Sequence, residues 1–156
     1  MDRDAFSDKD YKDRMLLDEM PGMGPLGGIH AALQSSSTEA NYFLPCDTPL
    51  IPSDLFIHLS QYWPNGDIIA PKDSLGKLHP MCSLISISAL EEIQDFLRLG
   101  GRSILDFLET TRLRTVYVNA AEKGIPDLCF LNINSPRDYR RLKMRKQGFG
   151  MQRREN

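Results

Sequence analysis

The sequence predicts an α/β fold with a mostly parallel sheet, and three observations support that prediction. Short apolar runs of strand length alternate along the chain with segments of helical periodicity. Such an alternation is typical of a parallel sheet covered by helices. At 156 residues, with 41% hydrophobic and 26% charged residues, the chain has the size and composition of one globular domain.

Four runs are expected to form the strands of this sheet. The run 41–44 is apolar and aromatic, and it is short enough to be a strand buried on both faces. Further candidates lie at 67–70 and 83–87. The clearest strand is the Thr-Val-Tyr-Val run at 115–118, because β-branched and aromatic residues favour extended structure.

Periodicity and capping signals place the helices between these strands. Apolar residues at i, i+3 and i+4 spacing predict helices over 29–34 and 54–62. A third periodic run ends at two glycines at 100–101, and shorter helices are expected over 104–109 and 136–146. The serines expected to cap these helices are Ser53, Ser88, Ser103 and Ser135.

The charge balance argues against several classes of function. Nineteen Lys and Arg against 21 Asp and Glu give a net charge of −2, which offers no overall attraction to nucleic acid or to an anionic membrane. No apolar run approaches the length of a membrane span. The first twenty residues hold seven acidic and four basic side chains, the opposite of a signal or transit peptide. We therefore expect a cytoplasmic protein without nucleic-acid or membrane partners.

The cysteines and the C-terminal charges have less specific interpretations. Three distant cysteines without a C-x-x-C pattern predict buried thiols in a reducing compartment, not a disulfide scaffold or a zinc site. Eight Lys or Arg lie in the last twenty residues, so we separate a basic tail at 147–156 from a domain at 1–146. Two interpretations of these last twenty residues stay open. They bind phosphate or nucleic acid, or they form the solvated end of a helix.

Asp47 is the sharpest candidate for chemistry. It follows the apolar run at 41–44, and the flanking Pro45 and Pro49 fix the backbone and end the strand. Ligands of open α/β sheets collect beyond the carboxyl ends of strands, and a carboxylate on a stiff turn suits Mg²⁺. Asp18 ends an earlier apolar run in the same way. The alternative is that Asp47 makes only a local turn or a cap.

Two further motifs leave alternatives open. Residues 22–27 match G-x-G-x-x-G, the fingerprint of a dinucleotide-binding domain, although Pro25 removes one N–H group that would face a pyrophosphate. These glycines can also let another ligand approach the backbone, or form a turn without a ligand. Asn132 and Asn134 alternate with apolar residues, so both amides lie on one face of an extended segment. They can bind a ligand or satisfy loop backbone.

Five segments resemble one family in their order and spacing. They are G-P-L-G-G-I at 24–29, L-P-C-D-T-P at 44–49, L-H-P-M-C at 78–82, G-R-S-I at 101–104 and F-L-N-I-N-S-P-x-D-Y at 130–139. Over residues 14–142 the sequence is similar to molybdenum cofactor guanylyltransferases. The resemblance implies a Rossmann-like three-layer nucleotidyltransferase fold. It also implies transfer of GMP from Mg·GTP to the terminal phosphate of molybdopterin, which forms the guanine dinucleotide cofactor and pyrophosphate.

The resemblance implies roles for individual residues and partners. Asp47 would coordinate Mg²⁺ and act as the catalytic residue. The implied GTP-binding residues are Asp18, Gly24, Leu26, Gly28 and Asp47. Among them, Gly24, Leu26 and Gly28 would shape the guanine pocket. Asn132 and Asn134 would line the molybdopterin-facing side. The implied partners are GTP, molybdopterin or the molybdenum cofactor, and other cofactor-synthesis proteins or molybdoenzymes.

The sequence departs from the family at its beginning. Family members open with a buried strand and a loop of pattern L-A-G-G-x-S-x-R-M-G-x-D-K, whose Arg and Lys hold the triphosphate, and this sequence contains no such loop. We therefore expect a partial domain that lacks its first strands, binds GTP weakly and turns over slowly. Two alternatives are a non-catalytic remnant that binds the pterin or a partner, and a dinucleotide-binding domain.

Overall fold

The computed structural model describes residues 22–135, 137, 138 and 140. Asp18 and the tail at 147–156 lie outside the described residues, as does most of the helix expected over 136–146. The described helices are α2 (Gly24–Gln34), α3 (Ser53–Ser60), α4 (Leu90–Arg98) and α5 (Ile104–Thr110), with 3-10 turns η2 (Ile87–Ala89), η3 (Ala121–Lys123) and η4 (Asp127–Phe130). The described strands are β1 (Ala40–Tyr42), β2 (Ile68–Lys72), β3 (Leu84–Ser86) and β4 (Thr115–Asn119).

The four described strands form one sheet in the order β1-β3-β2-β4. β2 pairs parallel with β4, whereas β3 pairs antiparallel with both of its neighbours. β1, β2 and β4 therefore point the same way, as a mostly parallel sheet requires. Of the four described strands, β3 alone runs in the opposite direction. Its reversal makes two of the three described ladders antiparallel. The segment between β2 and β3 contains no helix, whereas the crossover that joins a parallel pair is usually a helix.

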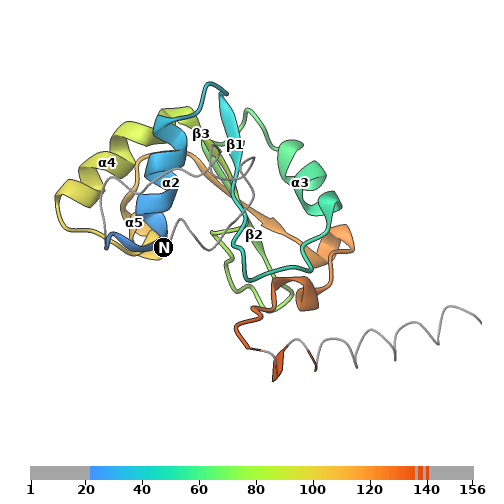
Figure 1. The fold of residues 1–156 in the computed structure, drawn as a ribbon. Helices are drawn as coiled ribbons and strands as arrows, with labels where there is room; N and C mark the ends of the chain where they lie inside the picture. Colours follow the sequence, from blue (N-terminus) through green and yellow to red (C-terminus); the bar gives the residue numbers. More distant parts are fainter. Residues whose placement is uncertain (1–21, 136, 139, 141–156) are drawn as a thin grey trace, which may run out of the picture.

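Helices and turns cover both faces of the sheet, which gives the three layers that the resemblance implies (Figure 1). On one face α2, α4 and α5 pack against the sheet, and on the other lie α3 and the turns η3 and η4. The first core contains Leu26, Ile29, Leu33, Ile68, Ile85, Ile93, Leu97 and Phe107. The second contains Leu55, Leu59, Ile69, Leu84, Val118, Cys129 and Phe130.

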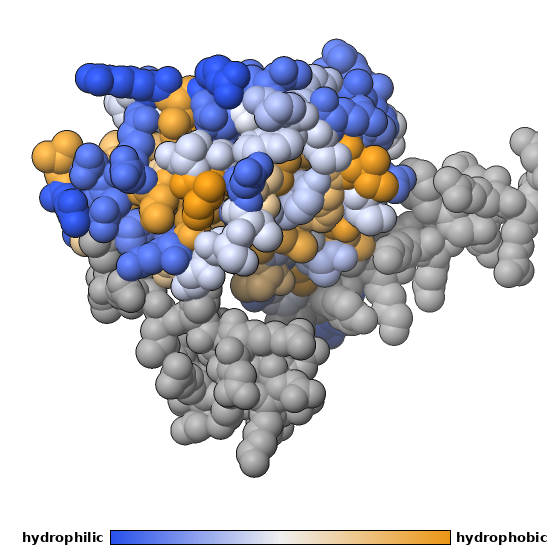
Figure 2. All heavy atoms as spheres, turned by 90° about the horizontal axis from the view of Figure 1, so that it is seen from above, coloured by the Kyte–Doolittle hydropathy of each residue, from blue (hydrophilic) through white to orange (hydrophobic). Residues whose placement is uncertain are grey.

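Strand β1 corrects one expectation, because it is not buried on both faces. It lies at an edge of the described sheet, and the side chain of Tyr42 is 48% exposed. The Tyr42 ring meets Phe56 of α3 edge-on at 5.0 Å between centroids, and its hydroxyl donates to the Phe56 carbonyl. Ile57 on the same helix is also exposed. Figure 2 shows hydrophobic residues reaching the surface between hydrophilic ones on the face seen from above.

Capping was predicted correctly at two of four serines. Ser103 accepts a hydrogen bond from the Asp106 N–H and Ser135 accepts one from the Asp138 N–H, both at 3.2 Å. Ser53 instead lies inside α3, and no side-chain cap precedes α4. The side-chain cap lies before η2, the 3-10 turn that precedes α4, where the Ser86 hydroxyl oxygen accepts a hydrogen bond from the Ser88 N–H.

Helix α2 begins five residues before the predicted start at residue 29. Pro25 occupies its first turn, where the missing N–H group costs nothing and the fixed φ favours helix. The glycine-rich segment is therefore the beginning of a helix. Within the described part of the chain, no helix is long and apolar enough to cross a membrane.

Candidate active site

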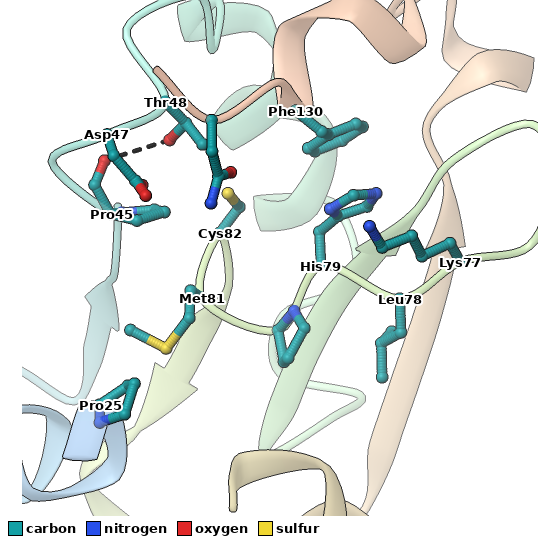
Figure 3. Close-up of a pocket in the computed structure, with 12 residues that line it drawn as sticks. Pro25, Pro45, Asp47, Thr48, Lys77, Leu78, His79, Met81, Cys82 and Phe130 are labelled. Carbon is teal, nitrogen blue, oxygen red and sulfur yellow. Dashed lines mark hydrogen bonds between the residues drawn. The ribbon is translucent and has the colours of Figure 1, made fainter. Parts of the chain in front are cut away.

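A cavity of about 360 Å³ lies beyond the carboxyl ends of β1 and β2. Its walls come from the turn after β1, the loop between β2 and β3, the segment after η4 and the first turn of α2. Figure 3 shows Pro45 and Asp47 on one side of it and Lys77, His79 and Phe130 on the other. This is the edge of an α/β sheet at which ligands usually bind.

A tight turn presents Asp47 to the cavity. The Pro45 carbonyl accepts hydrogen bonds from the Thr48 N–H at 3.4 Å and the Thr48 hydroxyl at 3.1 Å (Figure 3). Asp47 is half-buried and lines the cavity, and none of the described residues donates a hydrogen bond to its carboxylate. The alternative of a side chain bonded to its own turn is therefore not what the structure shows. The carboxylate oxygens are left for a ligand.

The segment that carries Asn132 and Asn134 is attached directly to this turn. The N–H group of Ile133 donates to the Asp47 carbonyl at 2.7 Å. Asn132 lines the cavity, whereas Asn134 is exposed and is not among the residues of its wall. The structure therefore brings Asp47 and Asn132 to one site and leaves Asn134 out of the cavity wall.

The three residues implied to shape a guanine pocket lie in different surroundings. Gly24 begins α2 with φ +65°, and Gly28 is exposed on the same helix. Leu26 is 1% exposed and packs in the core between α2, α4 and α5. Their neighbour Pro25 lines the cavity. The guanine-pocket role of Gly24, Leu26 and Gly28 stays a prediction.

The two glycines make a matched pair for a stability measurement. We expect Gly24→Ala to lower the free energy of unfolding by about 1 kcal/mol, because a side chain is strained at positive φ. Gly28→Ala should raise it by about 0.5–1 kcal/mol, because Gly28 is helical and no atom lies within 4 Å of an added Cβ. Urea unfolding measures both. Gly28→Ala should leave GTP affinity unchanged. A loss of GTP affinity in this variant would show that the ligand contacts α2 at Gly28.

Lys77 and His79 were not predicted as site residues. The His79 Nε2 lies 3.1 Å from Asp73 Oδ2, and its ring stacks on Phe130 with centroids 4.0 Å apart and planes 9° apart. The hydrogen bond from His79 is the main reason that the pKa of Asp73 lies below its ordinary value. The L-H-P-M-C segment was the only sequence signal here, and it carried no assigned role.

One of the three cysteines, Cys82, lines the cavity. Cys82 and Cys129 are buried and free, as predicted, but Cys46 is exposed. Burial raises the pKa of Cys82 to about 11 and that of Cys129 to about 12.

At pH 8 we expect a thiol reagent to modify Cys46 alone in the folded protein. Cys82 and Cys129 should react at least about 100-fold more slowly, because the thiolate is the reactive form and is scarce at these pKa values. All three should react in denaturant. Fast reaction of Cys82 in the folded protein, followed by peptide mass spectrometry, would contradict the packing beneath the cavity.

A three-layer α/β fold with a cavity at the carboxyl ends of its strands, where Asp47, Lys77 and Asn132 lie among apolar residues, defines a class of ligand-binding α/β proteins that includes the nucleotidyltransferases. The family described as "MobA-like NTP transferase domain" matches residues 3–116. The chain belongs to this family.

Similar proteins support the same family. Molybdenum cofactor guanylyltransferases of Yersinia pestis (strain Pestoides F) and Yersinia pseudotuberculosis (serotype O:3, strain YPIII) are each 34% identical over 128 residues, which is 81% of this chain. The chain spans 62% of the length of these relatives.

Solved structures show the same fold. Molybdopterin-guanine dinucleotide biosynthesis protein A from Archaeoglobus fulgidus superimposes with a TM-score of 0.67 at 27% identity, covering 85% of this chain and 70% of that one. A protein of Aquifex aeolicus VF5 gives a TM-score of 0.64 at 20% identity, covering 82% and 68%. The predicted nucleotidyltransferase fold is confirmed.

Proposed function

We propose that this protein transfers GMP from GTP to the terminal phosphate of molybdopterin. The observation that carries the proposal is the Asp47 carboxylate, which accepts no hydrogen bond from the described residues and lines a cavity together with Asn132. Family membership and the names of the relatives support the choice of reaction. In this reaction an oxygen of the acceptor phosphate attacks the α-phosphorus of GTP. A new P–O bond forms, and pyrophosphate leaves with the electrons of the bond that breaks.

The donor set of the cavity fits Mg²⁺ shared with a substrate. The described residues contain no group of three or more His, Cys, Asp or Glu side chains that could hold a metal alone. Mg²⁺ typically binds one or two carboxylates and completes its shell with water and substrate phosphates. Asp47 offers one such carboxylate beside open space. When bound, the ion would neutralise negative charge on the phosphates.

The chain's own residues would orient the reactants. Proline residues on both sides and the double hydrogen bond from Thr48 to Pro45 hold Asp47 on a stiff turn. The hydrogen bond from Ile133 to the Asp47 carbonyl ties Asn132 to the same turn. A carboxylate and an amide fixed in this way can position a ligand without reorganisation during the reaction, which is the main contribution of a protein to phosphoryl transfer.

A second candidate is a binding protein that recognises molybdopterin without turnover. The lining of the cavity favours it, because Lys77 is the only Lys or Arg among the described residues there and a triphosphate would need more positive charge. Asp47 and Asn132 would then bind the pterin compound alone.

Turnover and calorimetry under anaerobic conditions separate the two candidates. Mass spectrometry should show GMP joined to molybdopterin, with one pyrophosphate released per dinucleotide. Heat of binding with molybdopterin but none with Mg·GTP would support the binding protein. No binding of molybdopterin at all would overturn both.

A further inference from the structure

The loop 73–77 is closed upon one carboxylate. Asp73 Oδ1 accepts hydrogen bonds from the backbone N–H groups of Leu75 at 3.0 Å and Lys77 at 2.9 Å. The backbone N–H of Asp73 donates to the Lys77 carbonyl, and Gly76 turns the chain with φ +80°. Asp73 therefore fixes the backbone from which the Lys77 side chain extends into the cavity.

The second oxygen of the same carboxylate holds His79. A carboxylate only accepts, so the His79 Nε2 at 3.1 Å carries the proton of this hydrogen bond. Stacking on Phe130 fixes the plane of the ring. Among the described residues no partner bonds the other ring nitrogen, Nδ1. Asp73 thus orients two neighbouring side chains of the cavity wall, Lys77 through the backbone and His79 directly.

A separate contact attaches the loop 73–77 to the 3-10 turn η4. Ser74 donates to Asp127 of η4 through its N–H at 2.9 Å and also through its hydroxyl. η4 ends in Phe130, the residue on which His79 stacks. The loop is therefore held against η4 by a contact that touches neither Lys77 nor His79, which provides a control for purely structural effects.

The charges of the cavity are divided between its two sides. Asp47 lies on one side, and Lys77 is the only Lys or Arg among the described residues that line the cavity (Figure 3). No described acid forms an ion pair with the Lys77 ammonium. A phosphate dianion is repelled by the carboxylate and attracted by the ammonium, so its favourable position is beside Lys77.

We propose that the wall formed by Lys77 and His79 binds a phosphate monoester through the Lys77 ammonium, with the His79 ring as the other part of the wall, and that Asp73 is the positioning residue for both. The inference deepens the proposed function, because it assigns this wall to the terminal phosphate of the acceptor. The recognised chemistry is a phosphate monoester or free phosphate, with the pterin ring held elsewhere in the cavity.

Binding of inorganic phosphate, followed by ³¹P NMR titration, tests this wall without any turnover. Lys77→Ala should weaken binding by about 10-fold or more, whereas Lys77→Arg should stay within about 3-fold, since both cations bind phosphate. Asp73→Asn should weaken it by about 5-fold, because the amide can no longer accept from both Lys77 and His79 as an anion does. Lys123→Ala, which removes a lysine outside the cavity, is the matched control.

Asp127→Asn distinguishes positioning from simple loop stability. It should lower the melting temperature while leaving phosphate affinity within about 2-fold. If Asp127→Asn and Asp73→Asn weakened phosphate binding equally, Asp73 would be a structural residue only and the positioning role would be overturned. Unchanged affinity in Lys77→Ala would overturn the wall itself.

A comparison of molybdopterin with its dephosphorylated form separates this inference from the proposed function. We expect the native protein to prefer the phosphorylated form and Lys77→Ala to lose that preference. Binding of molybdopterin that is indifferent to Lys77→Ala would preserve the proposed function and overturn the wall. Lysine-dependent binding of inorganic phosphate without binding of either pterin would preserve the wall and overturn the proposed function.

Discussion

Asp47→Asn should lower kcat for guanylyl transfer by about 100- to 1,000-fold, the usual cost of removing one group that stabilises the transition state electrostatically. The amide keeps the size of the side chain but loses the charge that attracts Mg²⁺. Stability should change by less than about 0.5 kcal/mol, because no described residue donates a hydrogen bond to this carboxylate. Initial rates of pyrophosphate release and urea unfolding measure the two effects.

Asp54→Asn is the matched control for Asp47→Asn. Asp54 is an exposed carboxylate in the first turn of α3 and does not line the cavity. Its replacement should leave kcat within about 2-fold, because a surface substitution away from the site has small effects. A similar fall in kcat for both variants, or no fall for Asp47→Asn, would remove Asp47 from the catalytic machinery.

Leu26→Ala should lower the free energy of unfolding by about 2–5 kcal/mol, the range for leucine truncation in a packed core. Leu26 is 1% exposed and packs with Ile29, Leu33 and residues of α4 and α5. Truncation would leave a cavity that these rigid neighbours can fill only in part. GTP affinity of the folded fraction should not change, because Leu26 does not line the pocket.

Leu44→Ala is the corresponding control, since Leu44 is 53% exposed. It should cost less than about 0.5 kcal/mol. Unfolding followed by circular dichroism gives both values. Should Leu26→Ala keep the native stability but lose GTP affinity, the guanine-pocket role implied by the resemblance would replace the core role.

Local signals were sufficient for most elements of the fold. The β-branched run at 115–118 became β4, and the serines at 103 and 135 became caps, because these features depend on neighbouring residues only. The reversed direction of β3 could not be predicted in this way. It depends on how the segment after β2 returns to the sheet, which is a tertiary property.

The residues of the candidate site also separate into those with a local sequence signal and those that only the tertiary structure brings together. Asp47 and Asn132 were predicted, because a carboxylate between prolines and an alternating amide are visible in a single sequence segment. The Asp73–His79–Phe130 arrangement was missed, since Phe130 is brought to His79 from a distant part of the chain. Leu26 lies within a motif of the family resemblance, and only the packing of α2 shows that its side chain faces the core.

Paramagnetic broadening by Mn²⁺, used in place of Mg²⁺, tests most directly whether Asp47 holds a divalent cation in the cavity, close enough to broaden the resonance of an acceptor phosphate beside Lys77. We expect Mn²⁺ to broaden the ³¹P resonance of molybdopterin bound to the native protein. The broadening should be lost with Asp47→Asn at ligand concentrations that still saturate the variant. Equal broadening in both proteins would place the cation elsewhere and contradict the role of Asp47.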